Sequence, residues 1–406
     1  MDPRELGREA LRAIRAHTLR SFLTLLGIII GVATLVGVVS VITGLNAYVR
    51  DKVISLAPDV FVVTKFGIIR SREEFLDALK RKDIDWHDYE SLAGLLRQAE
   101  QVAAEAIGNS AVKFQDHRLA DVKIHGTTSN FGGMVGLDLS SGRYFVEAED
   151  ETAQALAVVG SDVKDERVPH LDPVGRTVLV GGMPYRVIGL LAKQGRTLGE
   201  SRDSQVFVPI QAYRRTFGNR TSLNILVRAR GGVPGLEASV DEVRAVMRAL
   251  RHTAFRAPDP FGVVTAESLQ TLWAQISAAA FMLSLLIASV SLGVGGIVIM
   301  NIMLVAVVER TREIGVRLAL GARKRDIRRQ FLLEAALLSL AGGVVGVTLG
   351  ALAAFGVRGI LDFPAQVTVP IVLAGIVLSV GVGVVAGYWP ARSASNLPVV
   401  EALRVE

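Results

Sequence analysis

Four long runs without Asp, Glu, Lys or Arg limit what this chain of 406 residues can fold into. Each run is about 22 residues or longer, enough to cross a hydrocarbon layer of roughly 30 Å as a helix. We therefore expect a membrane protein with four transmembrane α-helices. The predicted helices are residues 21–45, 266–308, 331–358 and 366–390.

The segment between the second and third runs, residues 309–330, carries eight Arg or Lys residues. Cytoplasmic loops of membrane proteins are enriched in Lys and Arg, and the amphipathic N-terminal segment, residues 1–20, is basic as well. Both are expected in the cytoplasm, together with the tail at 391–406, so residues 46–265 lie outside the cell (inner) membrane. Because the basic residues flank the spans, their predicted partners are lipid headgroups, and no nucleic-acid binding is expected.

A secretory signal is the alternative interpretation of the first run. The apolar core of a signal is roughly 7 to 15 residues long and ends at a cleavage site of small residues. This run is longer and leads into Gly44-Leu-Asn-Ala-Tyr48. An uncleaved membrane anchor is therefore preferred.

Residues 46–265 carry the patterns of a large α+β extracytoplasmic domain inserted between spans 1 and 2. Short β-branched runs bounded by Gly, Pro, Asp or Asn predict strands, and apolar residues at helical spacing predict helices at 85–96 and 236–250. The strand-rich part suggests an outer lobe, 118–215, inserted in a membrane-proximal lobe of 46–117 plus 216–265. No cysteine is present, so this domain must fold without disulfides.

Motifs of catalysis and metal binding are not found in the sequence. There is no Gly-Lys dipeptide, so the P-loop lysine that contacts phosphates is missing. The six histidines have no metal-ligand spacing and there is no cysteine to join them. An acidic run, Glu147 to Glu151, is interpreted as a solvated loop. We expect no enzyme activity and no catalytic, metal-binding or cofactor-binding residue in this chain.

Small residues recur at four-residue spacing within the spans, which carry no charge at their centres. Such stripes let helix backbones approach closely in lipid, although glycine is also simply frequent in membrane helices. Packing is the preferred interpretation of the longer stripes. The candidate packing residues are Gly27, Gly31, Gly342, Gly346, Gly350, Gly383 and Gly387. Uncharged span centres argue against a proton-coupled or ion-coupled carrier.

The second run is longer than a membrane requires, since its roughly 36 residues would make a helix of about 54 Å. Its N-terminal portion, about 265–276, is expected to continue outward as a stalk. The basic segment after it predicts a short helix at 309–320, with Glu313 and Arg317 at a favourable spacing and Gly321 ending the helix in a left-handed conformation. Docking on a soluble partner and lying among lipid headgroups are both compatible with this helix.

The segment 294–335, which contains ERTREIGVRLALGARKRD, closely resembles the signature of MacB-like ABC transporter permeases in the FtsX-like superfamily. Five further segments are similar to that family: 10–33, 141–145, 172–176, 185–189 and 389–404. The resemblance covers nearly the whole chain.

The resemblance implies a homodimeric permease of the type VII, mechanotransmission class, with a two-lobed outer domain. An ABC ATPase dimer, using ATP and Mg, would dock on the inner loop and drive the outer domains through the first and second spans. Carried onto this sequence, the coupling segment is residues 309–330. Its coupling residues are Glu309, Arg310, Arg312, Glu313, Gly315, Arg317 and Gly321. Many MacB proteins carry the ATPase fused at the N-terminus, whereas about 20 residues precede the first span here, so a separate ATPase subunit is expected.

The predicted function is export of a drug, peptide or toxin, with a periplasmic adaptor protein as a further partner. The alternatives are ATP-driven signalling to an extracytoplasmic partner such as a cell-wall hydrolase, and lipoprotein extraction. The size of the outer domain argues against the hydrolase regulators, and the ERTREIG motif looks more like MacB than like the lipoprotein branch. The sequence leaves the substrate open, as well as the choice between a homodimer and a heterodimer.

Overall fold

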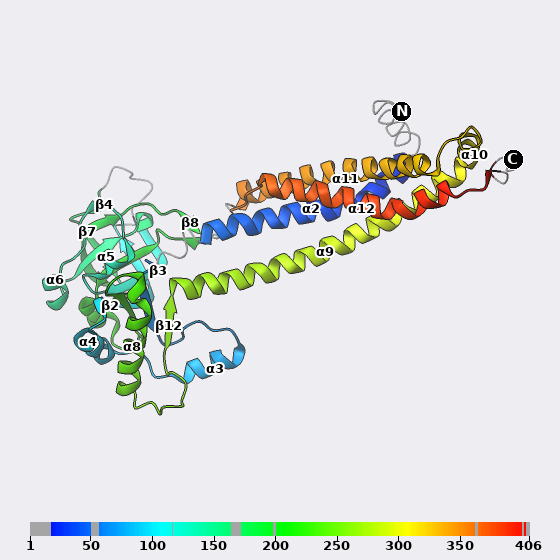
Figure 1. Cartoon of the computed structure of the whole chain (residues 1–406). Coiled ribbons are helices and arrows are strands. Elements are labelled where there is room, and N and C mark those ends of the chain that lie inside the picture. Colours follow the sequence, from blue (N-terminus) through cyan, green and yellow to red (C-terminus); the bar gives the residue numbers. More distant parts are fainter. Residues whose placement is uncertain are drawn as a thin grey trace. The chain divides into compact units, whose positions relative to one another are not determined.

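The computed structural model divides into two compact units, a helical bundle (Met1–Val49 with Ala274–Glu406) and an inserted domain (Arg50–Trp273) (Figure 1). The residues whose structure it describes are 18–49, 57–115, 117–163, 172–197, 200–361, 364–399 and 402.

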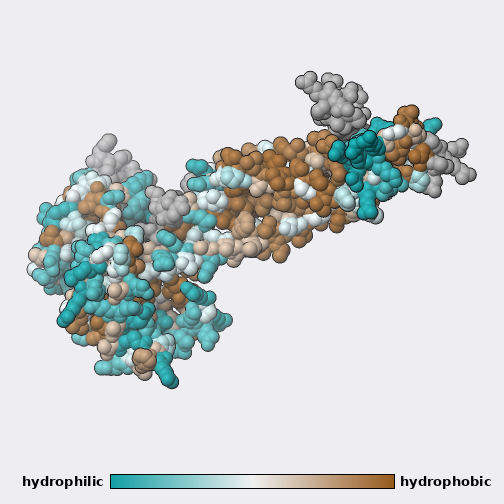
Figure 2. All heavy atoms as spheres, viewed as in Figure 1, coloured by the Kyte–Doolittle hydropathy of each residue, from teal (hydrophilic) through white to brown (hydrophobic). Residues whose placement is uncertain are grey.

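Four described helices are long and apolar enough to cross a membrane, which confirms the predicted number of spans. They are α2 (Thr18–Tyr48), α9 (Ala266–Glu309), α11 (Lys324–Leu361) and α12 (Val369–Ser395). A short helix, α10 (Thr311–Ala319), joins α9 to α11. Figure 2 shows hydrophobic residues along most of the bundle and hydrophilic residues gathered near the end where α10 lies.

The second span belongs to one unbroken helix, since α9 has 44 residues and is about 66 Å long at 1.5 Å per residue. It ends at Glu309, the residue at which the predicted coupling helix begins. The prediction placed Glu309 in that helix, but Glu309 is the last residue of α9, and α10 starts only at Thr311. The Thr311 hydroxyl donates hydrogen bonds to the carbonyls of Val307 and Val308, both at 2.9 Å, which favours a bend at this point.

The inserted domain is built on one ten-stranded mixed sheet in the order β12-β1-β11-β2-β3-β10-β5-β7-β4, with β6 paired to β2 and β7. The pairs β3–β10 and β5–β7 are parallel and the others are antiparallel. The strands are β1 (Val60–Thr64), β2 (Ala99–Phe114), β3 (His117–Thr127), β4 (Leu139–Gly142), β5 (Leu156–Val159), β6 (Thr177–Val180), β7 (Met183–Leu191), β10 (Gln205–Pro209), β11 (Asn224–Ala229) and β12 (Gly262–Thr265). A separate two-stranded sheet pairs β8 (Arg196–Thr197) with β9 (Glu200–Ser201).

The sixteen residues of β2 pair with β11 at one end and with β3 and β6 toward the other. Strand β2, which lies in the predicted membrane-proximal lobe, therefore pairs with strands of both predicted lobes, and the ten-stranded sheet extends across them. The division into two lobes stays a prediction.

Helices cover both faces of this sheet. They are α3 (Arg72–Lys80), α4 (Trp86–Leu95), α5 (Phe131–Val135), α6 (Glu147–Glu151), α7 (Ile210–Phe217) and α8 (Leu236–Leu250). Apolar side chains of α4, α7 and α8 enter one buried cluster, whereas those of α5 enter a second cluster. Tyr213 of α7 lies flat on the sheet because Gly108 and Gly126 leave room for it; a Cβ at Gly126 would be 2.4 Å from the Tyr213 Cβ.

The acidic run forms helix α6, not the solvated loop expected from its composition. Arg143 binds both carboxylate oxygens of Glu149, at 2.8 and 2.6 Å, and this pairing lowers the Glu149 pKa to about 2. Asp150 is buried and accepts a hydrogen bond from the backbone N–H of Gln211 at 3.2 Å. Burial raises the Asp150 pKa from 3.8 to about 6, and the backbone hydrogen bonds only partly oppose it.

A buried ion pair joins α4 to the residue that follows α8. Arg251 donates to the Asp88 carboxylate at 2.6 Å, and both side chains are 5% exposed. The same guanidinium donates to the carbonyls of Lys82 and Asp83 at 2.8 and 3.0 Å. These contacts join segments more than 160 residues apart in the chain.

Asp150→Asn should flatten the pH dependence of stability. Because the folded pKa lies above the ordinary value, the native state takes up a proton between about pH 3.8 and 6, and the protonated carboxyl stabilises the fold at low pH. That contribution is lost as the pH rises through about 6. Thermal unfolding of the purified chain from about pH 4 to 7 should show a smaller fall for Asp150→Asn than for the wild type. An unchanged slope of stability against pH would contradict the raised pKa of Asp150.

Arg251→Met should destabilise the inserted domain by about 3 to 5 kcal/mol, since it leaves the Asp88 carboxylate buried without its partner. Hydrogen exchange of the α4 amides in the full chain measures this change. The matched control is Arg244→Met, whose side chain is 44% exposed and pairs with Asp241 and Asp259 at the surface. The control should cost about 1 kcal/mol or less, and equal effects of the two variants would refute the distinction.

Candidate functional site

The inner face of α10 packs against the helical bundle. Ile314 and Gly315 are buried, and Ile314 belongs to an apolar cluster with Ile327 and Phe331 of α11. A Cβ at position 315 would lie 2.7 Å from the Cβ of Ala402, so the glycine allows the C-terminal segment to pack directly on α10. Gly315 thus has a packing role within the predicted coupling segment.

Two arginines, one at the N-cap of α10 and one within α10, bind side chains in the first turns of α11. Arg310 pairs with Glu334, with 2.9 Å between Nη1 and Oε1. Arg317 donates to the side-chain oxygen of Gln330 at 2.8 Å and also pairs with Glu313 on its own helix. Glu334 is 15% exposed, so its contact with Arg310 is partly shielded from water and screened less than a surface pair. These contacts fix α10 in both position and rotation.

Gly321 ends α10 in the left-handed region, with φ of 95°, as the sequence predicted. The N–H of Gly321 donates to Leu318 and the N–H of Ala322 donates to Arg317, at 3.1 and 3.0 Å. This pair of bonds is the Schellman motif, in which a residue other than glycine would be strained.

The outer face of α10 is exposed and mixes charge with apolar groups. Arg312, Glu313 and Val316 lie on it, and Leu320 at its end is 84% exposed. Val316 is 42% exposed and lies one turn before Leu320, so the two apolar side chains are adjacent on a face that also carries charge. We define the outer coupling face as Arg312, Glu313, Val316 and Leu320.

The helices α2 and α9 pair side by side and antiparallel. A Cβ at Gly27 would lie 2.8 Å from the Gly295 Cα, and one at Gly31 would meet Leu292 at 2.9 Å. Farther along, the Ser277 hydroxyl donates to the Asn46 side chain at 2.7 Å. The same register therefore holds at both ends of the pair.

The other candidate packing glycines lie at helix contacts as well. Cβ atoms at Gly346 and Gly350 would meet the α2 carbonyls of Ile29 and Ala33 at 2.9 and 2.7 Å, and one at Gly342 would meet Ile28 at 3.2 Å. On α12, Gly383 and Gly387 face α11, where their Cβ atoms would meet Ser339 and Ala335. All seven positions predicted from the sequence thus face a neighbouring helix.

Sequence patterns missed three residues of this arrangement. Gly295 is the partner of Gly27, but it lies in a run whose glycines have no regular spacing. Gln330 and Glu334 bind the two arginines of the coupling segment, yet Gln330 is the last residue of that predicted segment and Glu334 lies at the start of the predicted third span. A carboxylate four residues inside a predicted span was the available signal for Glu334.

The inserted domain carries a cleft of about 880 Å³ on the sheet face beside α5. On its floor the His125 Nδ1 is in hydrogen-bond contact with the Glu105 carboxylate at 2.8 Å, and the His125 ring stacks on Phe207, with ring centres 4.6 Å apart. Among the described residues no three His, Cys, Asp or Glu side chains meet as metal ligands. The geometry of this cleft offers a surface for binding.

Two family models match the chain, one in each half. Residues 21–250 match the MacB-like periplasmic core domain, and residues 285–399 match the FtsX-like permease C-terminal region. Together they include most of α2, most of the inserted domain and the whole coupling segment.

Curated relatives match nearly all of the chain. A protein of Azoarcus sp. (strain BH72) named macrolide export ATP-binding/permease protein MacB is 35% identical over 99% of this chain and 60% of its own length. The pyoverdine export ATP-binding/permease protein PvdT of Pseudomonas putida is 32% identical over 98% of this chain and 59% of its own length. The chain thus spans about three fifths of these relatives.

Among solved structures, the periplasmic region of MacB from Actinobacillus actinomycetemcomitans matches with a TM-score of 0.45 and 13% identity, covering 55% of this chain and 95% of that one. The family models and the sequence matches over nearly the whole of this chain show the family. The chain belongs to the MacB-like family of ABC transporter permeases, within the FtsX-like superfamily.

Proposed function

We propose that this chain is the permease of an exporter in which a separate ATPase subunit docks on the outer coupling face. The observation that carries the proposal is the division of α10 into two faces. Its inner face is fixed to the bundle through Ile314, Gly315 and the two arginine contacts, whereas its outer face is exposed. A partner that moves α10 would move the inner end of the bundle with it.

The path from α10 into the membrane is short. The helix α9 ends two residues before α10 begins, and the Thr311 hydroxyl bonds to carbonyls of its last turns. Because α9 is one helix and pairs with α2 at Gly27 and at Asn46, a shift at α10 reaches both helices. Both lead by chain continuity into the inserted domain.

The basic coupling segment supports a cytoplasmic position for α10 and both termini, and hence an inserted domain outside the membrane. We propose that the ATPase dimer uses ATP and Mg, and that this chain binds neither. The uncharged spans support handling of cargo by the inserted domain at the outer face.

The proposed oligomer is a homodimer. Along α9, Met282, Leu286 and Val290 are 62 to 66% exposed, a spacing that presents one apolar stripe to lipid or to a second copy. The cargo class proposed is a drug, peptide or toxin, as the relatives named for macrolide and pyoverdine export suggest, with a periplasmic adaptor protein as a further partner.

Exchanging the charges of α10 with Glu313→Arg and Arg317→Glu should uncouple the transporter. The exchange keeps the ion pair within the helix, and Gln330 can still donate to a glutamate at 317, but the charge presented outward is inverted. We expect at least about a tenfold loss of ATP-driven transport, roughly 1.4 kcal/mol or more of lost docking energy, with normal membrane levels. Transport in vesicles containing the ATPase measures this, and the chain alone should hydrolyse no ATP.

The matched control exchanges Arg325 and Asp326, which are exposed in the first turn of α11. This control leaves the outer coupling face intact and should keep most of the transport. Full activity of the α10 exchange variant, or ATP turnover by the purified chain, would count against the proposed docking site.

Cysteines at Asn46 and Ser277 should form a cross-link, since the two side chains are in hydrogen-bond contact. The wild-type chain has no cysteine, so the two introduced thiols are the only ones in each copy of it. Oxidation of Asn46→Cys/Ser277→Cys should fix α2 to α9 and abolish most transport, and a reductant should restore it. Gel mobility and transport assays report the two effects.

The control pairs Asn46→Cys with Ser289→Cys, which lies twelve positions farther along α9, about 18 Å away along the helix. It should give no intramolecular cross-link. Efficient cross-linking with undiminished transport would show that α2 and α9 do not need to move relative to each other.

A further inference from the structure

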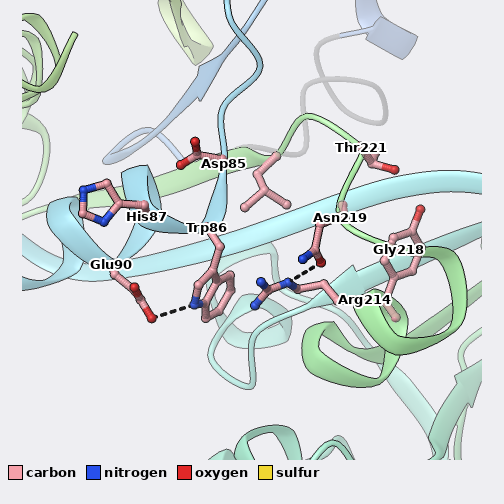
Figure 3. A pocket seen from close by; sticks show the side chains of 11 residues that line it. Asp85, Trp86, His87, Glu90, Arg214, Gly218, Asn219 and Thr221 are labelled. Atoms are coloured by element: carbon pink, nitrogen blue, oxygen red, sulfur yellow. Dashed lines mark hydrogen bonds between the residues drawn. The ribbon is translucent and has the colours of Figure 1, made fainter. Parts of the chain in front are cut away.

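A small pocket lies in the inserted domain between α4, α7 and the loop that follows α7 (Figure 3). Its volume is about 320 Å³, and Trp86, Arg214, Asn219 and Thr221 are among the residues that line it. This size suits a ligand no larger than one or two amino-acid residues, because pockets for drug-sized molecules begin at about 300 Å³.

Arg214 is held rigidly in this pocket. Its guanidinium carbon lies 4.8 Å from the centre of the Trp86 ring, a cation–π contact. Its Nε donates to the Asn219 side-chain oxygen at 2.9 Å and its Nη1 donates to Gln211 at 3.0 Å. The Trp86 ring is itself fixed, because its N–H donates to Glu90 at 2.7 Å. Figure 3 shows the guanidinium beside the indole, with Asn219 bonded to it.

The hydrogen-bond donors of the pocket are not all used. Within the described part of the chain, Nη2 of Arg214, the amide nitrogen of Asn219 and the hydroxyl of Thr221 have no hydrogen-bond partner. A planar guanidinium with open N–H groups matches the two oxygens of a carboxylate, and its fixed position reduces the entropy lost on binding.

The two acidic residues of the pocket are already engaged. Asp85 pairs with Lys82 at 2.9 Å and caps α4 by accepting from the backbone N–H of Asp88. Glu90 accepts from the Trp86 ring. Arg214, in the last turn of α7, lines the other side of the pocket, whereas Arg215 of the same turn and Arg220 of the following loop lie outside the lining. An anion is therefore expected to bind on the α7 side, away from the two carboxylates.

We propose that this pocket binds a carboxylate-bearing ligand of amino-acid size, either a free acid or the C-terminal residue of a peptide. The Arg214 guanidinium receives the carboxylate, and Asn219 and Thr221 donate at the sides. The proposal does not depend on the docking of an ATPase at α10, because every residue in it belongs to the inserted domain.

Trp86 provides a direct measurement in the full chain. The three tryptophans are Trp86, Trp273 and Trp389, so Trp273→Phe with Trp389→Phe leaves only the pocket residue to report. Titration with N-acetylalanine should change its emission saturably, whereas N-acetylalaninamide, which lacks the carboxylate, should not. Arg214→Gln should weaken the acid at least about tenfold, and Arg215→Gln, a neighbour on the same helix outside the pocket lining, should leave it unchanged.

Asn219→Asp serves as a second variant, since it places a negative charge beside Arg214 in an exposed loop without removing a buried group. It should also weaken binding of the acid.

Acetyl-trialanine with a free C-terminus distinguishes the two sources of the carboxylate. Tenfold tighter binding than N-acetylalanine identifies a peptide end, and equal binding identifies a small acid. Equal responses to the acid and the amide, equal losses in Arg214→Gln and Arg215→Gln, or no saturable response in the wild type would overturn the proposal.

Discussion

Close contact between helix backbones is the constraint on which the bundle depends. In lipid, apolar side chains gain nothing by leaving one hydrocarbon surface for another, so packing must supply the attraction between helices. Here the contacts occur where side chains are missing: Gly27 against Gly295, and Gly346 and Gly350 against carbonyls of α2. A Cβ at any of these positions would lie within 3 Å of a neighbouring backbone atom, so substitution would separate the helices.

The coupling helix α10 is attached to the bundle by a different kind of contact, because water is available at this end of the bundle. Charged contacts fix α10 there, in addition to its buried face. Arg310 and Arg317 reach Glu334 and Gln330 of α11, while Ile314 packs inward. Polar contacts have direction, so they set the rotation of α10 and thereby decide which residues face outward.

Sequence patterns predicted the four spans and the left-handed Gly321, because each depends on local chemistry. Charge cannot remain in the hydrocarbon layer, and a helix that ends at glycine needs no distant contact. The errors have the opposite cause. The buried state of Asp150 depends on α7, sixty residues away in the chain. The bend between α9 and α10 is an exception, because the Thr311 hydroxyl that favours it bonds only three and four residues back, a contact that apolar spacing does not reveal. Gly295 and Glu334 acquire their roles only from the helices that they meet.

The topology of the inserted domain bears on how motion would enter it. The strand β1 is the first described strand after α2, and β12 directly precedes α9, and these two strands pair with each other, Phe61 opposite Thr265. Entry and exit of the domain thus lie on adjacent strands at one edge of the sheet. Because β1 also pairs with β11, and β11 with the long β2, the edge where the domain is entered and left is continuous with the middle of the sheet. Buried ties such as Arg251 to Asp88 then favour movement of the domain as a body over local unfolding.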